Sequence, residues 1–388
     1  MKLSKVSRRN WLKASSLIMG GLVVGKVPAF GKSKPFNKKV KFTSELRVPI
    51  ADRPALKARL LANENPFGPS PKAKEVLRNS IDQSFRYPWA EFTQCKEMIA
   101  EKEGVKPENI TLAAGSTEIL LGAALAYGQG GASNILTADI TYMDLLESAE
   151  NHGAKIDAVP LTKELDYDLE AMQMKASAAH SLVYLVNPNN PTGKSLDPKK
   201  LKAFCDKVSP IIPVLVDEAY IDFKDDVAAN SMVACVREGK NVLVARTFSK
   251  LHAFAGLRMG YAIGLPETIE KIEKFTTGGR SITYPTIYAA MASYTDTEFL
   301  NYSKVEILKS KEFLYQTLED AGYTYVKSDA NFVLFPLKHM KSERFVEEML
   351  KDGVGVRSWS FRGKEWCRVS MGTMEEMKHF AKAFDKLS

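Results

Sequence analysis

Short apolar runs alternate with amphipathic stretches along most of this chain, and this alternation constrains the fold more than any other feature of the sequence. The apolar runs predict strands, several of them buried on both faces, at residues 110–112, 134–137, 155–159, 182–186, 213–217, 242–246 and 259–263. The stretches between them have helical spacing at residues 117–127, 142–151, 198–208 and 266–275. Strands that alternate with helices predict an α/β domain with a mainly parallel, seven-stranded sheet covered on both faces.

The C-terminal part of the chain, from about residue 285, has a different pattern. A long helical region at 298–319 precedes shorter predicted strands near 331–335, 354–357 and 366–370, and a final helix follows from Met374. We therefore predict a large domain at residues 61–284 and a smaller α+β domain at residues 285–388, because 388 residues are many for a single core. Residues 30–60 lack strong periodicity and predict an N-terminal arm.

The first 29 residues carry most of the net positive charge, with six Lys or Arg residues and no acidic residue in a chain of net charge +8. Residues 7–13 (SRRNWLK) resemble a twin-arginine export signal, an apolar stretch follows at residues 14–24, and cleavage is expected near Ala29. The apolar stretch is shorter than the about 20 residues that span a bilayer. We therefore predict a cleaved signal peptide at residues 1–29 and a periplasmic protein without a stable membrane anchor. An uncleaved anchor is the alternative.

Two other kinds of site are not predicted. The chain after the leader has no run of Lys and Arg interleaved with aromatic residues, so we expect no nucleic-acid binding. The four cysteines are widely spaced and form no C-x-x-C pair, so we predict no metal site. Export permits disulfides, and the sequence does not choose among the three pairings of four cysteines. The cysteines are Cys95, Cys205, Cys235 and Cys367.

Lys250 ends the segment Thr-Phe-Ser-Lys at residues 247–250, directly after a predicted strand. This places a lysine and two hydroxyls at the carboxyl edge of the sheet, where α/β proteins bind their ligands. A lysine there can form an imine with an aldehyde cofactor if its surroundings lower its pKa. A surface lysine after a strand is the alternative.

Asp217 ends another predicted strand, and Tyr220 follows three positions later. A carboxylate at this position can keep a pyridine nitrogen protonated, which makes the ring an electron sink, and Tyr220 can reach the phenolic oxygen of the same ring. Asn190, in the rigid loop at residues 187–193 (NPNNPTG), can donate its amide to that oxygen. The alternatives are a helix cap for Asp217, a core position for Tyr220 and a simple turn around Asn190.

Three further segments suit anions. Ser116 and Thr117 lie between a predicted strand and a predicted helix, where backbone amides and the helix dipole favour a phosphate, although a capping box is the alternative. Arg258 follows Lys250 by eight positions and can supply a cation to the same phosphate. Arg368 lies in a predicted strand of the small domain, where its guanidinium suits a substrate carboxylate or, alternatively, a surface ion pair.

In their order along the chain, these motifs resemble the fold-type-I pyridoxal-phosphate enzymes, in particular the class I/II aminotransferases of the histidinol-phosphate aminotransferase branch. The resemblance runs from residues 63–71 (NENPFGPSP) to Arg368 and includes residues 86–88 (RYP). It implies that Lys250 holds pyridoxal 5'-phosphate as a Schiff base and moves a proton between substrate and cofactor. It also implies that Asp217 pairs with the ring nitrogen, that Asn190 and Tyr220 hold the phenolic oxygen, and that Tyr142 stacks on the ring.

The same resemblance implies further ligands and a homodimer with shared active sites. The implied phosphate ligands are Ser116, Thr117, Ser249 and Arg258, with Tyr87 contributed by the other subunit. Arg368 is expected to bind the α-carboxylate of the substrate, and Arg357 and Asn65 are expected to make further substrate contacts.

The sequence departs from the family pattern at two places. Residues 49–55 (PIADRPA) lack the tyrosine that histidinol-phosphate enzymes carry there, and residues 140–142 read Ile-Thr-Tyr instead of Pro-Thr-Tyr. The predicted reaction is therefore transfer of an amino group from an amino acid to a 2-oxo acid, with both partners unnamed. The alternatives are a decarboxylase or lyase on the same scaffold, similar to threonine-phosphate decarboxylase, and a non-catalytic carrier of the cofactor.

Overall fold

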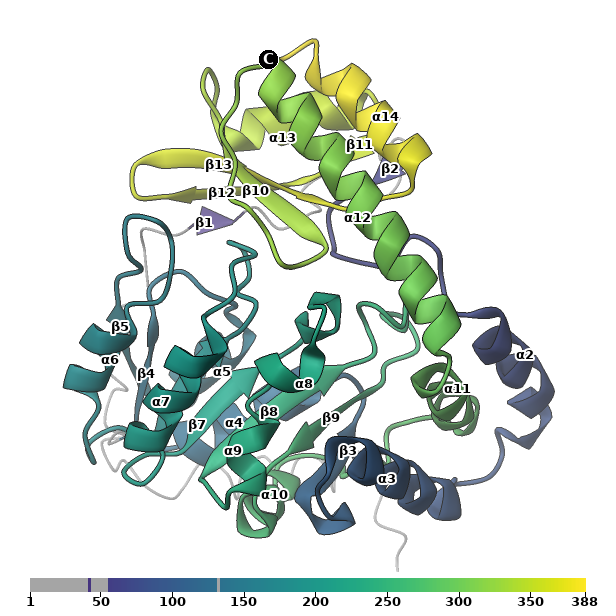
Figure 1. The fold of residues 1–388 in the computed structure, drawn as a ribbon, viewed down its shortest axis with the longest axis vertical. Coiled ribbons are helices and arrows are strands. Elements are labelled where there is room, and N and C mark those ends of the chain that lie inside the picture. The colour runs from purple at the N-terminus through teal and green to yellow at the C-terminus, as the bar shows by residue number, and fades with distance from the viewer. Residues whose placement is uncertain (1–40, 43–54, 131–132) are drawn as a thin grey trace, which may run out of the picture. The chain divides into compact units, whose positions relative to one another are not determined.

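A seven-stranded sheet forms the centre of the large domain in the computed structural model, which describes residues 41–42, 55–130 and 133–388 (Figure 1). The strand order is β3-β9-β8-β7-β6-β4-β5, and β9 runs antiparallel to both of its neighbours while the remaining pairs are parallel. The strands are β3 (Ile110–Ala113), β4 (Asn134–Ala138), β5 (Lys155–Val159), β6 (Leu182–Val186), β7 (Val214–Asp217), β8 (Val242–Thr247) and β9 (Gly260–Ile263). The predicted α/β sheet and its seven strands are confirmed.

Helices cover both faces of this sheet, because its central strands are apolar on both sides. Every residue of β6, β7 and β8 is buried, as in parallel sheets with two covered faces. One apolar cluster joins the sheet to α4 (Ser116–Gly128), α5 (Asp144–Asn151) and α10 (Pro266–Glu273). A second cluster lies on the other face and includes residues of α3 (Trp89–Glu103), α6 (Leu169–Lys175), α7 (Pro198–Val208), α9 (Val233–Arg237) and α11 (Tyr284–Tyr294). The remaining large-domain helices are α2 (Pro71–Ser80) and α8 (Val227–Asn230).

The smaller domain is built on an antiparallel sheet with the order β1-β12-β13-β10. Its strands are β1 (Lys41–Phe42), β10 (Phe332–Pro336), β12 (Arg357–Phe361) and β13 (Lys364–Ser370). Aromatic side chains of β10, α13 (Ser342–Lys351) and α14 (Met374–Phe384) form its core, which also contacts α12 (Thr297–Asp320). The long helix α12 leads from the large domain into this smaller one (Figure 1). The predicted α+β character of the C-terminal part is confirmed.

Two details differ from the sequence prediction. The predicted strand 354–357 is divided into β11 (Val354–Gly355) and the start of β12, which belong to different sheets. β11 pairs in parallel with β2 (Ala58–Arg59), so the end of the predicted arm contributes a strand beside the C-terminal domain. This pairing is invisible to periodicity because each strand is only two residues long.

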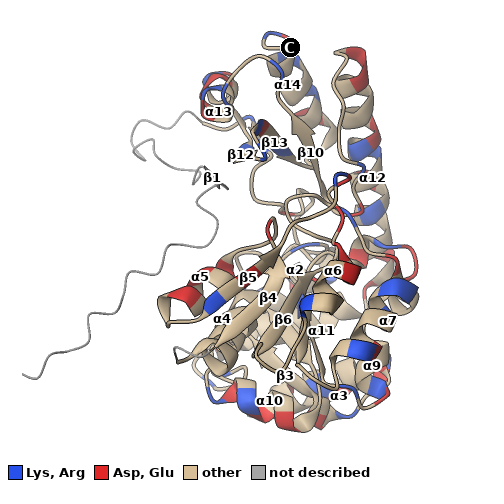
Figure 2. Cartoon of the chain, turned by 90° about the vertical axis from the view of Figure 1, so that its left-hand side faces the viewer, with Lys and Arg blue, Asp and Glu red and all other residues tan. Residues whose placement is uncertain are grey.

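The predicted leader at residues 1–29 lies outside the described residues, as does most of the predicted arm. Among the helices that the structure describes, none is both long and apolar enough to cross a membrane. Basic and acidic residues alternate along the helices of both domains (Figure 2).

Candidate active site

The carboxyl ends of three parallel strands meet at one cavity. Val186 of β6 pairs in register with Asp217 of β7, and Asp217 pairs with Ala245 of β8, so the loops that follow these strands start side by side. Eleven of the thirteen residues predicted for the site line this cavity. They are Ser116, Thr117, Tyr142, Asn190, Asp217, Tyr220, Ser249, Lys250, Arg258, Arg357 and Arg368.

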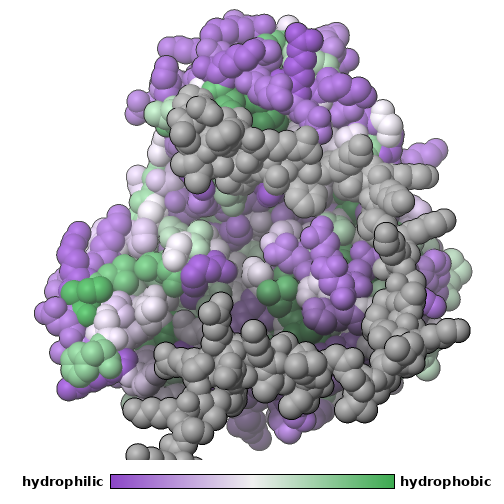
Figure 3. All heavy atoms as spheres, turned by 180° about the vertical axis from the view of Figure 1, so that it is seen from behind, coloured by the Kyte–Doolittle hydropathy of each residue, from purple (hydrophilic) through white to green (hydrophobic). Residues whose placement is uncertain are grey.

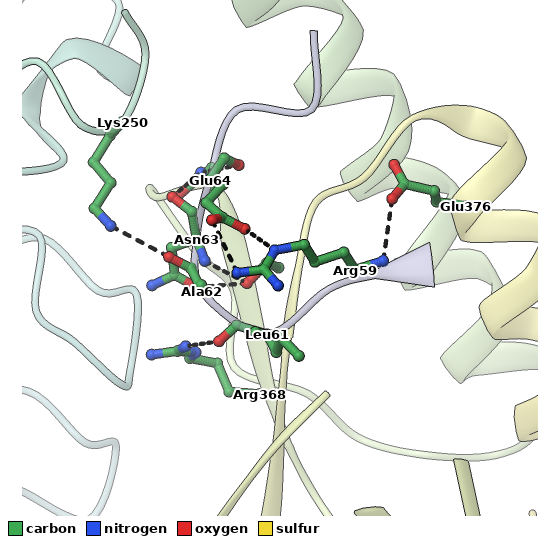
Figure 4. A network of polar contacts seen from close by, with 10 residues as sticks. Arg59, Leu61, Ala62, Asn63, Glu64, Lys250, Arg368 and Glu376 are labelled. Carbon is green, nitrogen blue, oxygen red and sulfur yellow. Dashed lines mark hydrogen bonds and ion pairs between the residues drawn. The ribbon is translucent and has the colours of Figure 1, made fainter. Parts of the chain in front are cut away.

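Lys250 extends its amine into the cavity, in contrast to the surface lysine of the alternative interpretation. Its Nζ lies 3.4 Å from the carbonyl oxygen of Ala62 and 5.5 Å from the centre of the Tyr220 ring. Figure 4 shows this side chain pointing toward the segment at residues 61–64. The amine is therefore placed to react with a ligand held between the sheet edge and this segment.

Asp217 is buried at the end of β7, with 2% of its surface exposed. One carboxylate oxygen accepts a hydrogen bond of 3.0 Å from the backbone N–H of Ala219. The helical turn that follows, at Ile221–Phe223, has Tyr220 as its N-cap, so Asp217 is not the helix cap of the alternative interpretation. Burial raises the pKa of this carboxyl to about 7, although the Ala219 bond and the charge of Lys250 act to lower it. A cationic partner in the cavity would therefore stabilise its charged form.

Tyr220 and Asn190 both hold hydrogen bonds that leave a donor for a ligand. The Tyr220 hydroxyl oxygen accepts a bond of 2.8 Å from Asn63 Nδ2, so its own proton remains for another acceptor. Asn190 Oδ1 accepts a bond of 2.8 Å from Arg368 Nη1, which fixes the side chain and leaves its amide nitrogen as the donor. Both side chains line the cavity.

Tyr142 also lines the cavity, just before α5 begins. Its hydroxyl donates a hydrogen bond of 2.5 Å to Asp144 Oδ2. Burial raises the pKa of this phenol well above its ordinary value, and the neighbouring Asp144 carboxylate raises it further. Tyr142 therefore stays neutral and presents a fixed aromatic ring.

An anion-binding corner lies where β3 turns into α4. Ser116 and Thr117 are the first residues of α4, whose N-cap is Gly115 with φ 87°. The Arg258 guanidinium is held by the carbonyl oxygens of Ala255 at 2.8 Å and Ala114 at 3.2 Å. A side chain at Gly115 would place its Cβ 2.4 Å from Arg258 Nη2, so only glycine allows this approach. Helix amides, hydroxyls and a guanidinium together suit a phosphate.

Two arginines from the small domain complete the opposite wall. Arg368 is 1% exposed, which rules out the surface ion pair of the alternative interpretation. Its Nη2 donates a hydrogen bond of 2.7 Å to the carbonyl oxygen of Leu61, as Figure 4 shows. Arg357 lies directly opposite Arg368 in the β12–β13 register. The two guanidinium groups give this end of the cavity a positive charge suited to carboxylates or phosphates.

Asn63 is a cavity residue that the sequence interpretation missed. It adopts φ 53°, and its amide connects Tyr220 in the large domain with Ser370 in β13, whose hydroxyl donates a 2.7 Å bond to Asn63 Oδ1. Asn65, the residue chosen from this motif, does not line the cavity; its side chain donates to the carbonyl oxygen of Leu251 at 2.7 Å and to Ser303 at 3.2 Å. The sequence signal for Asn63 was that asparagine tolerates positive φ. Because Asn65 is also an asparagine, this signal did not distinguish the two residues.

Tyr87 also lies outside the cavity of its own chain, with 72% of its surface exposed. Its predicted place is in the site of the other subunit, which a single chain does not contain. Among the described residues there is no cluster of three or more metal-binding side chains, and all four cysteines are buried free thiols.

A comparison with known protein families identifies the family of this chain. The model of the aminotransferase class I and II family matches residues 57–384. The chain belongs to this family. Transamination is therefore its reaction, and the large sheet with its smaller C-terminal sheet is the fold-type-I architecture that was predicted.

Three relatives illustrate the match. This chain is 34% identical over 331 residues to the histidinol-phosphate aminotransferase of Moorella thermoacetica, with 85% of each chain covered. The crystal structure of a relative from Erwinia carotovora atroseptica SCRI1043 has 31% sequence identity to this chain and a TM-score of 0.81, and the match covers 86% of this chain and 97% of the other. The histidinol-phosphate aminotransferase of Sinorhizobium meliloti, solved in complex with pyridoxal-5'-phosphate, has 24% identity and a TM-score of 0.78 over 86% of this chain and 92% of the other. At that last identity the likeness concerns the fold alone.

Proposed function

We propose that this aminotransferase binds pyridoxal 5'-phosphate in the cavity and holds it as a Schiff base on Lys250. The observation that carries the proposal is the convergence of one amine, one buried carboxylate and one anion-binding helix terminus on a single cavity. When bound, the cofactor supplies an electron sink for the carbanion that forms when the substrate loses a proton. The family membership supports this assignment, and the Sinorhizobium protein solved with this cofactor has the same fold.

The polar atoms of the cavity fit this cofactor. Ser116, Thr117, Ser249 and Arg258 surround the corner suited to the phosphate. Asp217 lies on the neighbouring strand end and gains a cationic partner if the ring nitrogen is protonated, which compensates for the cost of its burial. Tyr220 and Asn190 each offer one hydrogen-bond donor to the phenolic oxygen.

Other residues of the cavity would then have separate roles in the reaction. With the cofactor bound, the Lys250 amine, which extends into the cavity, would be the group that holds the aldehyde and that could move the substrate proton. Asp217 keeps the ring nitrogen protonated, and the Tyr142 ring limits tilting of the ligand by stacking. Arg368, fixed by Asn190 and Leu61, binds the substrate carboxylate.

We further propose that the substrates carry a second anionic group that contacts Arg357. Arg357 is opposite Arg368 in the sheet and lines the same cavity. Dicarboxylic amino acids and phosphorylated amines such as L-histidinol phosphate, the substrate named for the Moorella relative, both meet this requirement. A singly charged amino acid would bring no second anionic group to this end of the cavity.

A product assay tests the reaction directly. Purified holoenzyme is incubated in single turnover with L-glutamate, L-aspartate, L-histidinol phosphate and L-alanine as separate donors. We expect a 2-oxo acid from each amino acid and a ketone from L-histidinol phosphate, with loss of the cofactor's visible band, faster for the doubly anionic donors than for alanine. Release of carbon dioxide instead would identify the decarboxylase alternative and contradict the proposal.

We propose that two copies of the chain form a homodimer that shares its active sites. Large apolar residues at the start of α3 and before it are exposed: Phe85 by 75%, Tyr87 by 72% and Trp89 by 57%. In Figure 3 hydrophobic side chains also reach the surface on the left of the view, the side on which α2 lies. Clusters of exposed aromatic residues are typical of interaction surfaces.

We also propose that the aminotransferase is exported to the periplasm through the twin-arginine route. The support is the sequence of residues 7–13 and the basic, acid-free leader that contains it. Cell fractionation of the full chain and of the double variant Arg8→Lys, Arg9→Lys tests the proposal. We expect the cofactor-loaded enzyme in the periplasm for the natural sequence and in the cytoplasm for the variant; equal distribution of the two would contradict it.

A further inference from the structure

The hairpin that carries both arginines of the cavity extends beyond it and reaches the large domain. β12 and β13 pair in register from Arg357↔Arg368 to Phe361↔Lys364, so the hairpin closes with the two-residue turn Arg362–Gly363. Arg357 and Arg368 at the base line the cavity, whereas Arg362 lies at the tip, in the turn that follows the end of β12 at Phe361. The position of the two substrate-facing guanidinium groups therefore depends on how the hairpin is held.

At the tip, the side chain of Arg362 makes the polar contacts with the large domain. Arg362 Nη2 donates a hydrogen bond of 2.6 Å to the carbonyl oxygen of Leu161, and Nη1 donates one of 2.7 Å to that of Thr162. The Asp139 carboxylate lies 3.6 Å from Nη2 and itself accepts the backbone N–H of Leu161 at 2.9 Å. These acceptors follow β4 and β5 of the large domain, so the guanidinium bridges the two domains with charge-assisted bonds.

The geometry of the turn directs the arginine toward these acceptors. Arg362 has φ 51° and Gly363 has φ 71°, so both central residues of the turn have positive φ. This matches a two-residue type I′ hairpin, in which glycine is favourable and arginine is uncommon. An arginine in this strained position is explained by the contacts that its side chain makes.

Apolar packing below the tip follows the same path. The rings of Phe361 and Trp366 stack with centres 4.9 Å apart and planes 7° apart. Both residues belong to the buried cluster that contains Val159 and Leu161 of the large domain. The outer half of the hairpin is therefore packed on the large domain, and Arg362 closes the edge of this contact.

We propose that Arg362 is a positioning residue for substrate binding, which latches the β12–β13 hairpin to the large domain and so keeps Arg357 and Arg368 in the cavity. This inference deepens the proposed function and rests on its assignment of the two arginines to the substrate. Displacement of a binding group by about 1 Å can cost 100-fold in rate or affinity. Arg362 touches neither cofactor nor substrate and acts through the hairpin.

The test compares Arg362→Ala and Arg362→Lys with Lys364→Ala, a control on the same hairpin whose side chain is exposed. KM and kcat are measured on the holoenzyme with the best donor of the product assay, and hydrogen exchange is measured for the peptide covering residues 357–370. Loss of two charge-assisted bonds should raise KM about 10-fold in Arg362→Ala with kcat changed by less than about twofold. The lysine variant, which can satisfy one carbonyl, should be intermediate.

Hydrogen exchange distinguishes an error in the proposed role of Arg362 from an error in the proposed function. Faster exchange of the hairpin in Arg362→Ala, but not in Lys364→Ala, together with the higher KM supports the inference. Unchanged exchange in Arg362→Ala overturns it whatever the kinetics show. Faster exchange with an unchanged KM also overturns it; in that case Arg368→Lys is assayed in parallel, and an unchanged KM there would place the error in the proposed substrate role of Arg368.

Discussion

Asp217 is the residue whose environment most strongly indicates its chemistry. It lies fully buried beside an amine, and burial alone would favour its neutral form. A protonated ring nitrogen reverses this preference, because it supplies the positive charge that the site otherwise lacks at that oxygen. Burial of the charged Asp217 carboxylate therefore destabilises the cofactor-free protein, and binding of the cofactor removes this destabilisation.

This reasoning predicts how the stability of the cofactor-free enzyme depends on pH. The pKa of Asp217 is about 7 when folded, above the ordinary value of 3.8 for an aspartate, so the unfolded chain loses this proton first as pH rises. Stability due to this group is therefore complete below about pH 4, is lost between pH 4 and 7 and stays lost above. Asp217→Asn should gain stability relative to the natural protein across this window, by roughly 2–4 kcal/mol at pH 8.

Urea denaturation of both cofactor-free proteins at pH 4.5 and pH 8 measures this difference. The holoenzyme comparison is the control, since there the variant should keep the cofactor but lose activity by about 100-fold or more. A stability difference that does not change with pH would contradict the protonation state assigned to Asp217, and full activity of the variant would remove its role as partner of the ring nitrogen.

At the same scale, the sequence predicted most of the cavity but not all of it. Residues at or near the ends of buried strands, such as Asp217 and Lys250, were predictable because the carboxyl ends of parallel strands meet at one edge. Asn63 was not, because it follows no strand of that sheet and depends on hydrogen bonds to residues far away in the sequence. Asn65, two positions later, is also an asparagine but does not line the cavity.

The β3–α4 connection is the element on which phosphate binding depends. Gly115 combines φ 87° with close approach of the Arg258 guanidinium. We predict that Gly115→Ala lowers cofactor affinity about 10-fold or more, because the new methyl group displaces Arg258 and the backbone is strained. Fluorescence titration of the cofactor-free variant with pyridoxal 5'-phosphate measures this.

Gly153→Ala is the matched control for this element. Gly153 also has positive φ, at 96°, but nothing lies within 4 Å of the added Cβ. It should therefore show the backbone strain without the loss of cofactor affinity. Equal affinities of the two variants would contradict the role of Gly115 in cofactor binding.

Among elements, long strands and helices were predictable from periodicity, whereas the short β2 and β11 were not. A two-residue strand shows no periodicity, and its pairing partner lies about 300 residues away in the sequence. The predicted strand 354–357 was placed correctly in the chain but divides between two sheets at Val356, because Val354 and Arg357 pair with different partners. Tertiary pairing decides such cases.

At the scale of the whole molecule, the exposed Tyr87 predicts that active sites are shared between subunits. The variants Lys250→Ala and Tyr87→Ala should each be impaired as homodimers, since one lacks the amine and the other a ligand from its partner. After unfolding and reassociation of an equal mixture, hybrid dimers contain one intact site, so about one quarter of natural activity should return. Light scattering before mixing confirms the dimer.

The control for this experiment is the mixture without reassociation. Its activity should remain the mean of the two homodimers. If the reassociated mixture also shows only this mean, the sites are not shared and Tyr87 does not serve the partner. A monomer by light scattering would contradict the homodimer itself.

The central claim is the covalent link between the cofactor aldehyde and the amine of Lys250. The most direct measurement is borohydride reduction of the holoenzyme, followed by digestion and mass spectrometry of the peptides. The account predicts a pyridoxyl-phosphate adduct on the peptide that contains Lys250 and on no other, and its loss together with the visible band in Lys250→Ala. An adduct on a different lysine, or none on this peptide, would contradict the account.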